Sequence, residues 1–213
     1  ENQLFRHTPS SAQRFWPLSI LCFHPCQETL EGLFPVKVNP SISGWARVNF
    51  SYIPREVFLR VKREGQIWTL SKDGKIWPRS LDLEPQQGRQ DVPVVEWADD
   101  LPPIFENEKD KVVNGSTLPI HKIKCWLEGI SEAGWAEDPI HLNVKKRTGR
   151  LVLELHRKFG GTEIKLILPE DTVRWTQIFQ ALKEIRQRLT GKEKWVQIDA
   201  TYDDKIVVKR DIL

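Results

Sequence analysis

The chain has 213 residues, 39% of them hydrophobic, which is enough to bury one large core or two small ones. Its 32 basic and 29 acidic side chains leave a net charge of only +3, which argues against a dedicated nucleic-acid-binding protein. No apolar run reaches the about 18 residues that a membrane-spanning helix needs, and no segment has the layout of a signal peptide. Because the chain begins at Glu1 and contains no methionine, we expect it to be part of a longer protein, with a membrane anchor upstream.

The first third of the chain predicts a lead-in and a small α+β unit. Residues 1–13 are polar and predict a flexible lead-in, and residues 14–62 predict the unit. The apolar run 15–23 predicts a strand, 25–32 a short helix, and 36–38, 45–52 and 57–61 further strands, with a turn at 39–41. The expected order of a strand, a helix and further strands indicates a compact α+β unit.

Residues 63–213 predict a second domain, built on a sheet. Asp73-Gly74 lies between two aromatic and β-branched runs, which predicts a hairpin over 65–78. Residues 78–90 and 106–116 predict loops, and the two prolines at 102 and 103 predict an extended connection over 97–104. Apolar residues at helical spacing predict a helix over 118–130, which Gly134 ends.

The last 70 or so residues give the clearest pattern. Strands are predicted at 140–144, 151–156 and 164–168, with hairpin turns at 147–149 and 159–162. A helix is predicted over 172–189, started by Asp171 or Thr172 and ended by Gly191, with one apolar stripe and a basic face that we expect to be solvated. Strands 196–200 and 205–210 follow. The fold class is therefore α+β, with a mainly antiparallel sheet covered by helices.

Three cysteines exclude a complete set of disulfides. Cys22, His24 and Cys26 have spacing that could hold zinc, but a fourth ligand is missing unless His7 supplies it. Ordinary buried thiols are the preferred interpretation, and a Cys22–Cys26 bridge stays open. We expect no metal and no cofactor.

An enzyme is the rival class. His121, His141 and His156 could act with carboxylates as acid–base pairs. No Gly-x-Ser-x-Gly, His-Glu-x-x-His or phosphate-binding glycine loop accompanies them. We therefore expect a protein without catalytic activity.

The order of motifs resembles the extracytoplasmic part of the FtsQ/DivIB bacterial cell-division proteins. The residues that carry the resemblance are 58–64 (FLRVKRE), 67–78 (IWTLSKDGKIWP), 101–104 (LPPI) and 196–209 (VQIDATYDDKIVVK). The family begins with a POTRA (polypeptide-transport-associated) domain of two helices, and residues 14–62 have room for one clear helix. This unit would therefore be a reduced POTRA-like domain.

The resemblance implies a non-enzymatic scaffold of the division machinery. Such a protein crosses the cell inner membrane once, holds this domain on the extracytoplasmic side, and binds small coiled-coil membrane proteins like FtsB and FtsL. No nucleic acid and no small-molecule substrate are expected. The alternative is a POTRA-like recruiting module of another envelope-assembly or secretion system.

In the family, the partner adds a strand near the last strands of the sheet. The matching residues here are Tyr202, Lys205, Ile206, Val207, Val208 and Lys209. An exposed strand edge offers N–H and C=O groups that another chain can pair with, and flanking lysines would discourage unselective pairing. The alternative is that this strand is paired entirely within the chain.

Overall fold

The computed structural model describes residues 16–43, 47–83, 92–106, 111–135, 139–159, 161–188 and 193–212, but not the side chains of 16–24, 42–48, 159, 186 and 212. The chain forms two compact units that interleave along the sequence. The first unit contains residues 1–57, 69–85 and 105–116, and the second contains 58–68, 86–104 and 117–213. The domain boundary that we expected after residue 62 stays a prediction.

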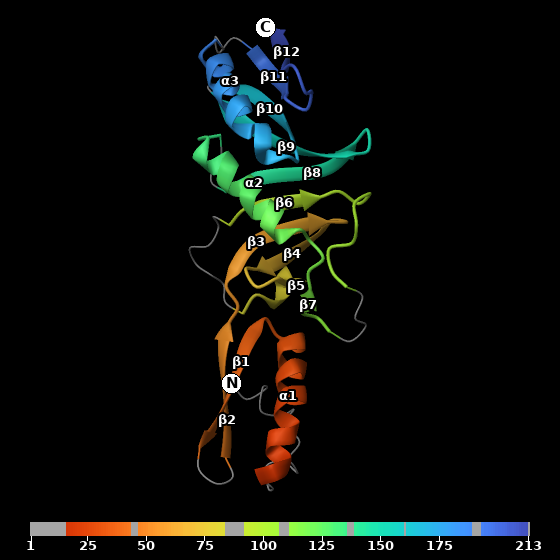
Figure 1. Ribbon diagram of the computed structural model, residues 1–213, viewed down its shortest axis with the longest axis vertical. Coiled ribbons are helices and arrows are strands. Elements are labelled where there is room, and N and C mark those ends of the chain that lie inside the picture. The colour runs from red at the N-terminus through yellow and green to blue at the C-terminus, as the bar shows by residue number, and fades with distance from the viewer. Residues whose placement is uncertain are drawn as a thin grey trace. The chain divides into compact units, whose positions relative to one another are not determined.

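In the first unit, helix α1 (Trp16–Leu33) lies beside a hairpin of β1 (Val36–Ser43) and β2 (Arg47–Pro54) (Figure 1). Leu30, Val36 and Val38 form a small buried core there. The strand expected at 15–23 is wrong, because α1 covers these residues from Trp16. A short apolar run fits a strand or a buried helix segment equally well, so periodicity could not decide.

The turn expected at 39–41 is also wrong, because these residues belong to β1 and Pro40 pairs in register with Phe50. The proline suggested a turn, but both strands of a two-stranded sheet are edge strands. A proline is tolerated there, since the outer side of each strand needs no backbone N–H donor. The hairpin expected over 65–78 is confirmed as β4 (Gln66–Ser71) and β5 (Lys75–Pro78), and Gly74 has a φ of 83° in its turn. The strand order is β4-β5-β7, where β7 (Asn114–Gly115) lies inside a segment expected to be a loop. A 3-10 helix, η3 (Arg79–Leu81), follows β5.

The second unit is built on a sheet whose strand order is β12-β11-β10-β9-β8-β6-β3-β4. Its strands are β3 (Val57–Arg63), β6 (Val94–Trp97), β8 (His141–Arg147), β9 (Arg150–Phe159), β10 (Thr162–Pro169), β11 (Glu193–Asp199) and β12 (Val207–Ile212), with part of β4. The pairs β3–β6, β6–β8 and β10–β11 are parallel, whereas β8–β9, β9–β10 and β11–β12 are antiparallel. The α+β class is confirmed, with a sheet that is mixed.

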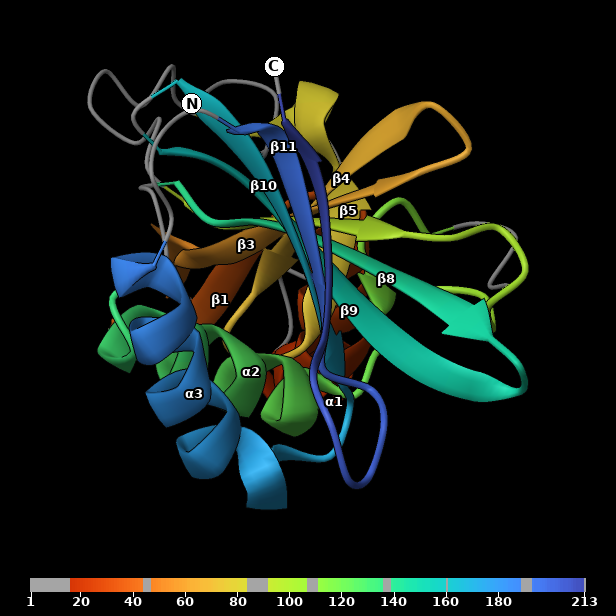
Figure 2. The ribbon, with the colours of Figure 1, turned by 90° about the horizontal axis from the view of Figure 1, so that it is seen from above.

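Helices α2 (Ile120–Glu132) and α3 (Trp175–Gln187) cover one face of this sheet (Figure 2). Both helices were predicted, and their apolar stripes are buried. The helix α3 follows a 3-10 turn, η4 (Thr172–Arg174), and the Asp171 carboxylate accepts a hydrogen bond from the Val173 N–H at 3.0 Å, as expected for a cap. Gly129 lets the Trp175 ring of α3 pack closely against α2, because a Cβ there would lie 2.9 Å from that ring.

The turns that join the central strands need residues that tolerate positive φ. Thr148 and Gly149, with φ of 49° and 81°, form the two-residue turn between β8 and β9. The extended connection after β6 is held by Arg63, whose guanidinium donates hydrogen bonds to the carbonyls of Leu101 and Pro102 at 3.1 and 2.5 Å. Within the described residues, no helix is both long and apolar enough to cross a bilayer.

Candidate partner-binding edge

Strand β12 lies at the end of the sheet of the second unit. It pairs with β11 in antiparallel register, with Val207 opposite Asp199 and Val208 opposite Ile198. The strand order gives β12 no second neighbour among the described residues. One side of β12 is thus engaged by the chain itself, and its outer N–H and C=O groups remain for another strand.

The register also assigns the side chains of β12 to the two faces of the sheet. Directly opposite residues of an antiparallel pair share a face. Val208 and Arg210 therefore lie on the helix-covered face with Ile198 and Val196, which are fully buried. The residues on the open face are Val207, Lys209 and Asp211 of β12 and Asp199, Gln197 and Trp195 of β11.

Tyr202 and Lys205 lie in the connection between β11 and β12, shortly before β12 begins at Val207. The Tyr202 side chain is 42% exposed, and the Lys205 ammonium lies 5.6 Å from the centre of its ring. A cation at this distance over an aromatic face is attracted by the ring. Ile206, which follows, is half-buried.

The connection is held from the helix side by Arg174. Its guanidinium donates to the Tyr202 carbonyl at 3.1 Å and to the Asp203 carboxylate at 3.2 Å, and it also reaches the Asp203 carbonyl. Three bonds from one side chain fix the backbone that carries Tyr202, so this aromatic ring is presented from an ordered segment.

Asp199 holds the other end of the connection. Its buried carboxylate accepts the Thr201 hydroxyl at 2.6 Å and the Thr201 N–H at 3.1 Å, and it pairs with Arg147 at 2.5 Å. Burial by itself would raise the pKa of Asp199, but the Thr201 bonds and the Arg147 charge outweigh it and lower the pKa below 3.8. The carboxylate is therefore ionised at neutral pH and pulls the chain into a turn toward β12.

A second charged cluster crosses the middle of the open face. Glu154 of β9 is only 4% exposed, and its two carboxylate oxygens pair with Lys145 of β8 at 2.7 Å and Lys165 of β10 at 3.1 Å. Burial tends to raise the pKa of Glu154, but the two lysines lower it overall. This face is therefore a polar, ion-paired surface, whereas the other face is the core.

The histidines considered as catalytic residues are divided between the sheet and helix α2. His141 and His156 are exposed on β8 and β9, whereas His121 is exposed on α2, where its Nδ1 lies 3.6 Å from the Cys125 sulfur. Among the described residues, no group of three His, Cys, Asp or Glu side chains could hold a metal ion. The side chains of His7, Cys22 and His24 lie outside the described set, and Cys26 is half-buried on α1.

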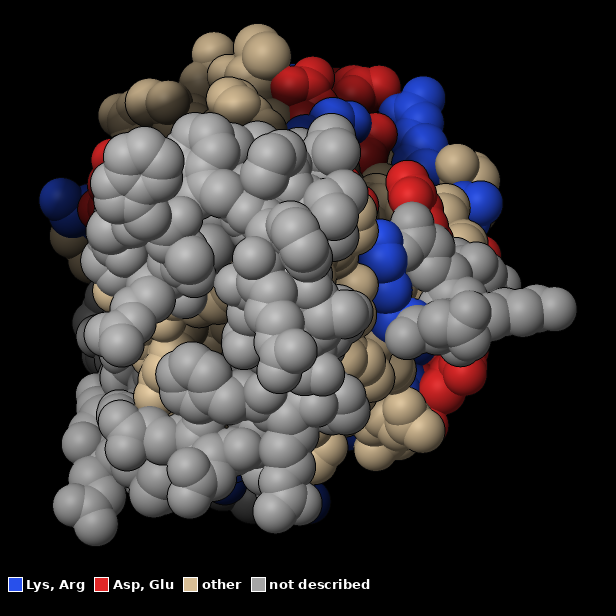
Figure 3. Space-filling view, turned by 90° about the horizontal axis from the view of Figure 1, so that it is seen from below, with Lys and Arg blue, Asp and Glu red and all other residues tan. Residues whose placement is uncertain are grey.

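Charges of both signs intermix on the surface. In Figure 3, where described residues are visible, Lys and Arg side chains lie beside Asp and Glu side chains.

Sequence reasoning missed three residues near the edge. Trp195 is 39% exposed on the open face, opposite Asp211. The available signal was strand alternation, which places Trp195 on the same face as Gln197 and on the face opposite to Val196. Arg147 and Arg174 come from distant segments, and nothing in their local sequence indicated their partners.

Comparison with known proteins adds no relative: no protein-family model and no curated protein matches this sequence.

Proposed function

We propose that this chain is a non-enzymatic binding domain of the FtsQ/DivIB kind, which joins a bacterial division complex by accepting a strand from a partner at β12. In this proposal the domain lies on the extracytoplasmic side of the inner membrane, held by a single membrane span outside this sequence. Its partners are small coiled-coil membrane proteins like FtsB and FtsL.

The observation that carries the proposal is the one-sided pairing of β12. The strand is in register with β11 along its inner side and has no further strand neighbour among the described residues. Its residues Val207 and Val208 are half-buried and supply the β-branched character that favours strand pairing. Strand addition uses these backbone groups for affinity and alternate side chains for specificity.

The connection supports the same proposal. Arg174 and Asp199 order the segment that presents Tyr202 and Lys205 beside the start of β12. A preordered segment loses less conformational entropy when a partner binds. Tyrosine contributes a large contact area with few rotatable bonds, which suits it to an interface.

A pair of proline variants tests the docking edge. Successive residues of a strand direct their N–H groups to opposite edges, so of Val207→Pro and Val208→Pro one removes an outer donor and the other breaks the ladder to β11. We expect the outer variant to lose binding of an FtsB-like ectodomain fragment while keeping its melting temperature within a few degrees. The inner variant should lower the melting temperature.

Val112→Ser, a change at an exposed residue of the first unit, is the control and should bind like the wild type. Binding is measured by surface plasmon resonance with the immobilised partner fragment. If both proline variants bind the fragment as tightly as Val112→Ser does, the partner does not dock at β12.

The recruiting-module alternative is favoured by one observation in the first unit. There α1, β1 and β2 enclose a core of their own, so this part can present a surface independently of β12. The alternative predicts that the binding partner is retained by both proline variants and is lost on changing Tyr52 and Ile53, which are exposed on β2.

A further inference from the structure

Three consecutive charged residues occupy the centre of the edge strand. Lys209, Arg210 and Asp211 are all exposed, and within the described residues none of them has an ion-pair partner. Elsewhere on this sheet, charged residues such as Glu154 are paired within the chain. The edge therefore carries charges that no ion pair among the described residues neutralises.

The charges lie on both faces of the sheet. Lys209 shares the open face with Gln197, and Arg210 shares the helix-covered face with Val196 but is itself exposed. A strand added beside β12 must therefore meet a cation on each face, at two successive residues.

We propose that β12 selects a partner strand with two consecutive acidic residues opposite Lys209 and Arg210. The next residue opposite Asp211 is a cation, and the residues opposite Val207 and Val208 are apolar. Read along an antiparallel partner, the stronger of the two strand arrangements per residue, the order is cation, acid, acid, apolar, apolar. This inference rests on the proposed function, because it names the partner of the same edge.

The partner chemistry is tested with two labelled peptides, one containing Lys-Glu-Glu-Val-Val and one with its charges reversed, Glu-Lys-Lys-Val-Val. Fluorescence anisotropy on the wild-type chain at low salt should show about tenfold tighter binding of the first, as three cross-strand charge pairs predict. The double variant Lys209→Glu/Arg210→Glu should reverse this preference. Equal binding of both peptides, or a preference unchanged in the double variant, overturns the selectivity.

The proposed function and the acidic-pair inference can be refuted separately. If the partner fragment binds both proline variants as tightly as it binds the wild type, the proposed docking at β12 is wrong. If those variants abolish binding while the fragment binds the wild type and the double charge variant equally, β12 is the docking edge and only the acidic-pair inference is wrong.

Discussion

Replacing Asp199 with asparagine tests whether the connection to β12 is held by a buried ionised carboxylate. The carboxylate, only 3% exposed, bonds to the Thr201 hydroxyl, the Thr201 N–H and Arg147. Hydrogen bonds to a charged group contribute about 1.5–3 kcal/mol each, but Asn keeps one acceptor and the Arg147 side chain is 43% exposed, which weakens that pair. We therefore expect Asp199→Asn to lower the free energy of unfolding by about 2 kcal/mol.

Urea unfolding followed by tryptophan fluorescence measures this free energy, with an unchanged m-value as the check that the unfolded state is the same. The control is Asp203→Asn, because the Asp203 side chain is 85% exposed at its pair with Arg174 and should cost about 0.5 kcal/mol or less. An Asp199→Asn variant as stable as the Asp203 variant would refute the reasoning.

The pH dependence of the same variant has a definite sign. Because folding lowers the pKa of Asp199, its stabilisation is fully present above 3.8 and is lost as the pH falls through the folded-state pKa. The difference in unfolding free energy between wild type and Asp199→Asn should therefore be constant near neutral pH and shrink below pH 3.8. A difference that grows in acid would contradict the ionised state.

Three further substitutions test the packing of the two units. Glu154→Gln should cost about 1–3 kcal/mol in urea unfolding, because it leaves two lysines close together without their carboxylate. Since folding lowers the pKa of Glu154, the loss should fade as the pH drops below 4.5. Gly129→Val should lower stability by about 1–3 kcal/mol through overlap with the Trp175 ring, whereas Gly115→Val, with no atom near its Cβ, should cost less. Arg55→Leu leaves two carboxylates without their shared guanidinium, so its thermal unfolding temperature should fall, and an unchanged temperature would contradict the network.

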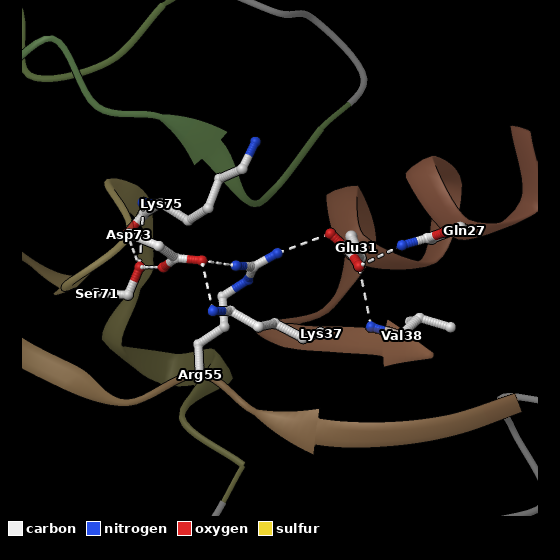
Figure 4. A network of polar contacts seen from close by, with 8 residues as sticks. All are labelled: Gln27, Glu31, Lys37, Val38, Arg55, Ser71, Asp73 and Lys75. Carbon is white, nitrogen blue, oxygen red and sulfur yellow. Dashed lines mark hydrogen bonds and ion pairs between the residues drawn. The ribbon is translucent and has the colours of Figure 1, made fainter. Parts of the chain in front are cut away.

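The network around Arg55 lies in the first unit and joins segments that are far apart in sequence (Figure 4). Arg55 is 3% exposed and bonds to Glu31 of α1 at 2.8 Å and to Asp73 in the β4–β5 turn. Burial raises the pKa of Asp73, but the Ser71 hydroxyl and the charges of Arg55 and Lys37 lower it overall. Asp73 was chosen from the sequence as a turn residue, and its second contribution, as an ion-pair partner of the buried Arg55, had no local signal.

Local patterns predicted the C-terminal half of the fold well. Alternation over 151–168 predicted β9 and β10, and the apolar stripe over 172–189 predicted α3, because each pattern needs only the periodicity of its own element. The same reasoning failed for 15–23, where a short apolar run fits two structures. It also gave no information on the parallel pairing of β10 with β11, because a crossover through α3 brings those strands together.

The candidate site divides in the same way. The sequence by itself determined that a β-branched, lysine-flanked strand ends the chain, with Tyr202 shortly before it, because these are properties of consecutive residues. Only the tertiary structure decided that β12 lies at the end of the sheet, that Lys209 and Arg210 lie on opposite faces without ion-pair partners among the described residues, and that Arg174 and Arg147 fix the preceding connection. Those relations depend on contacts across 28 and 52 residues of chain, and no local periodicity encodes them.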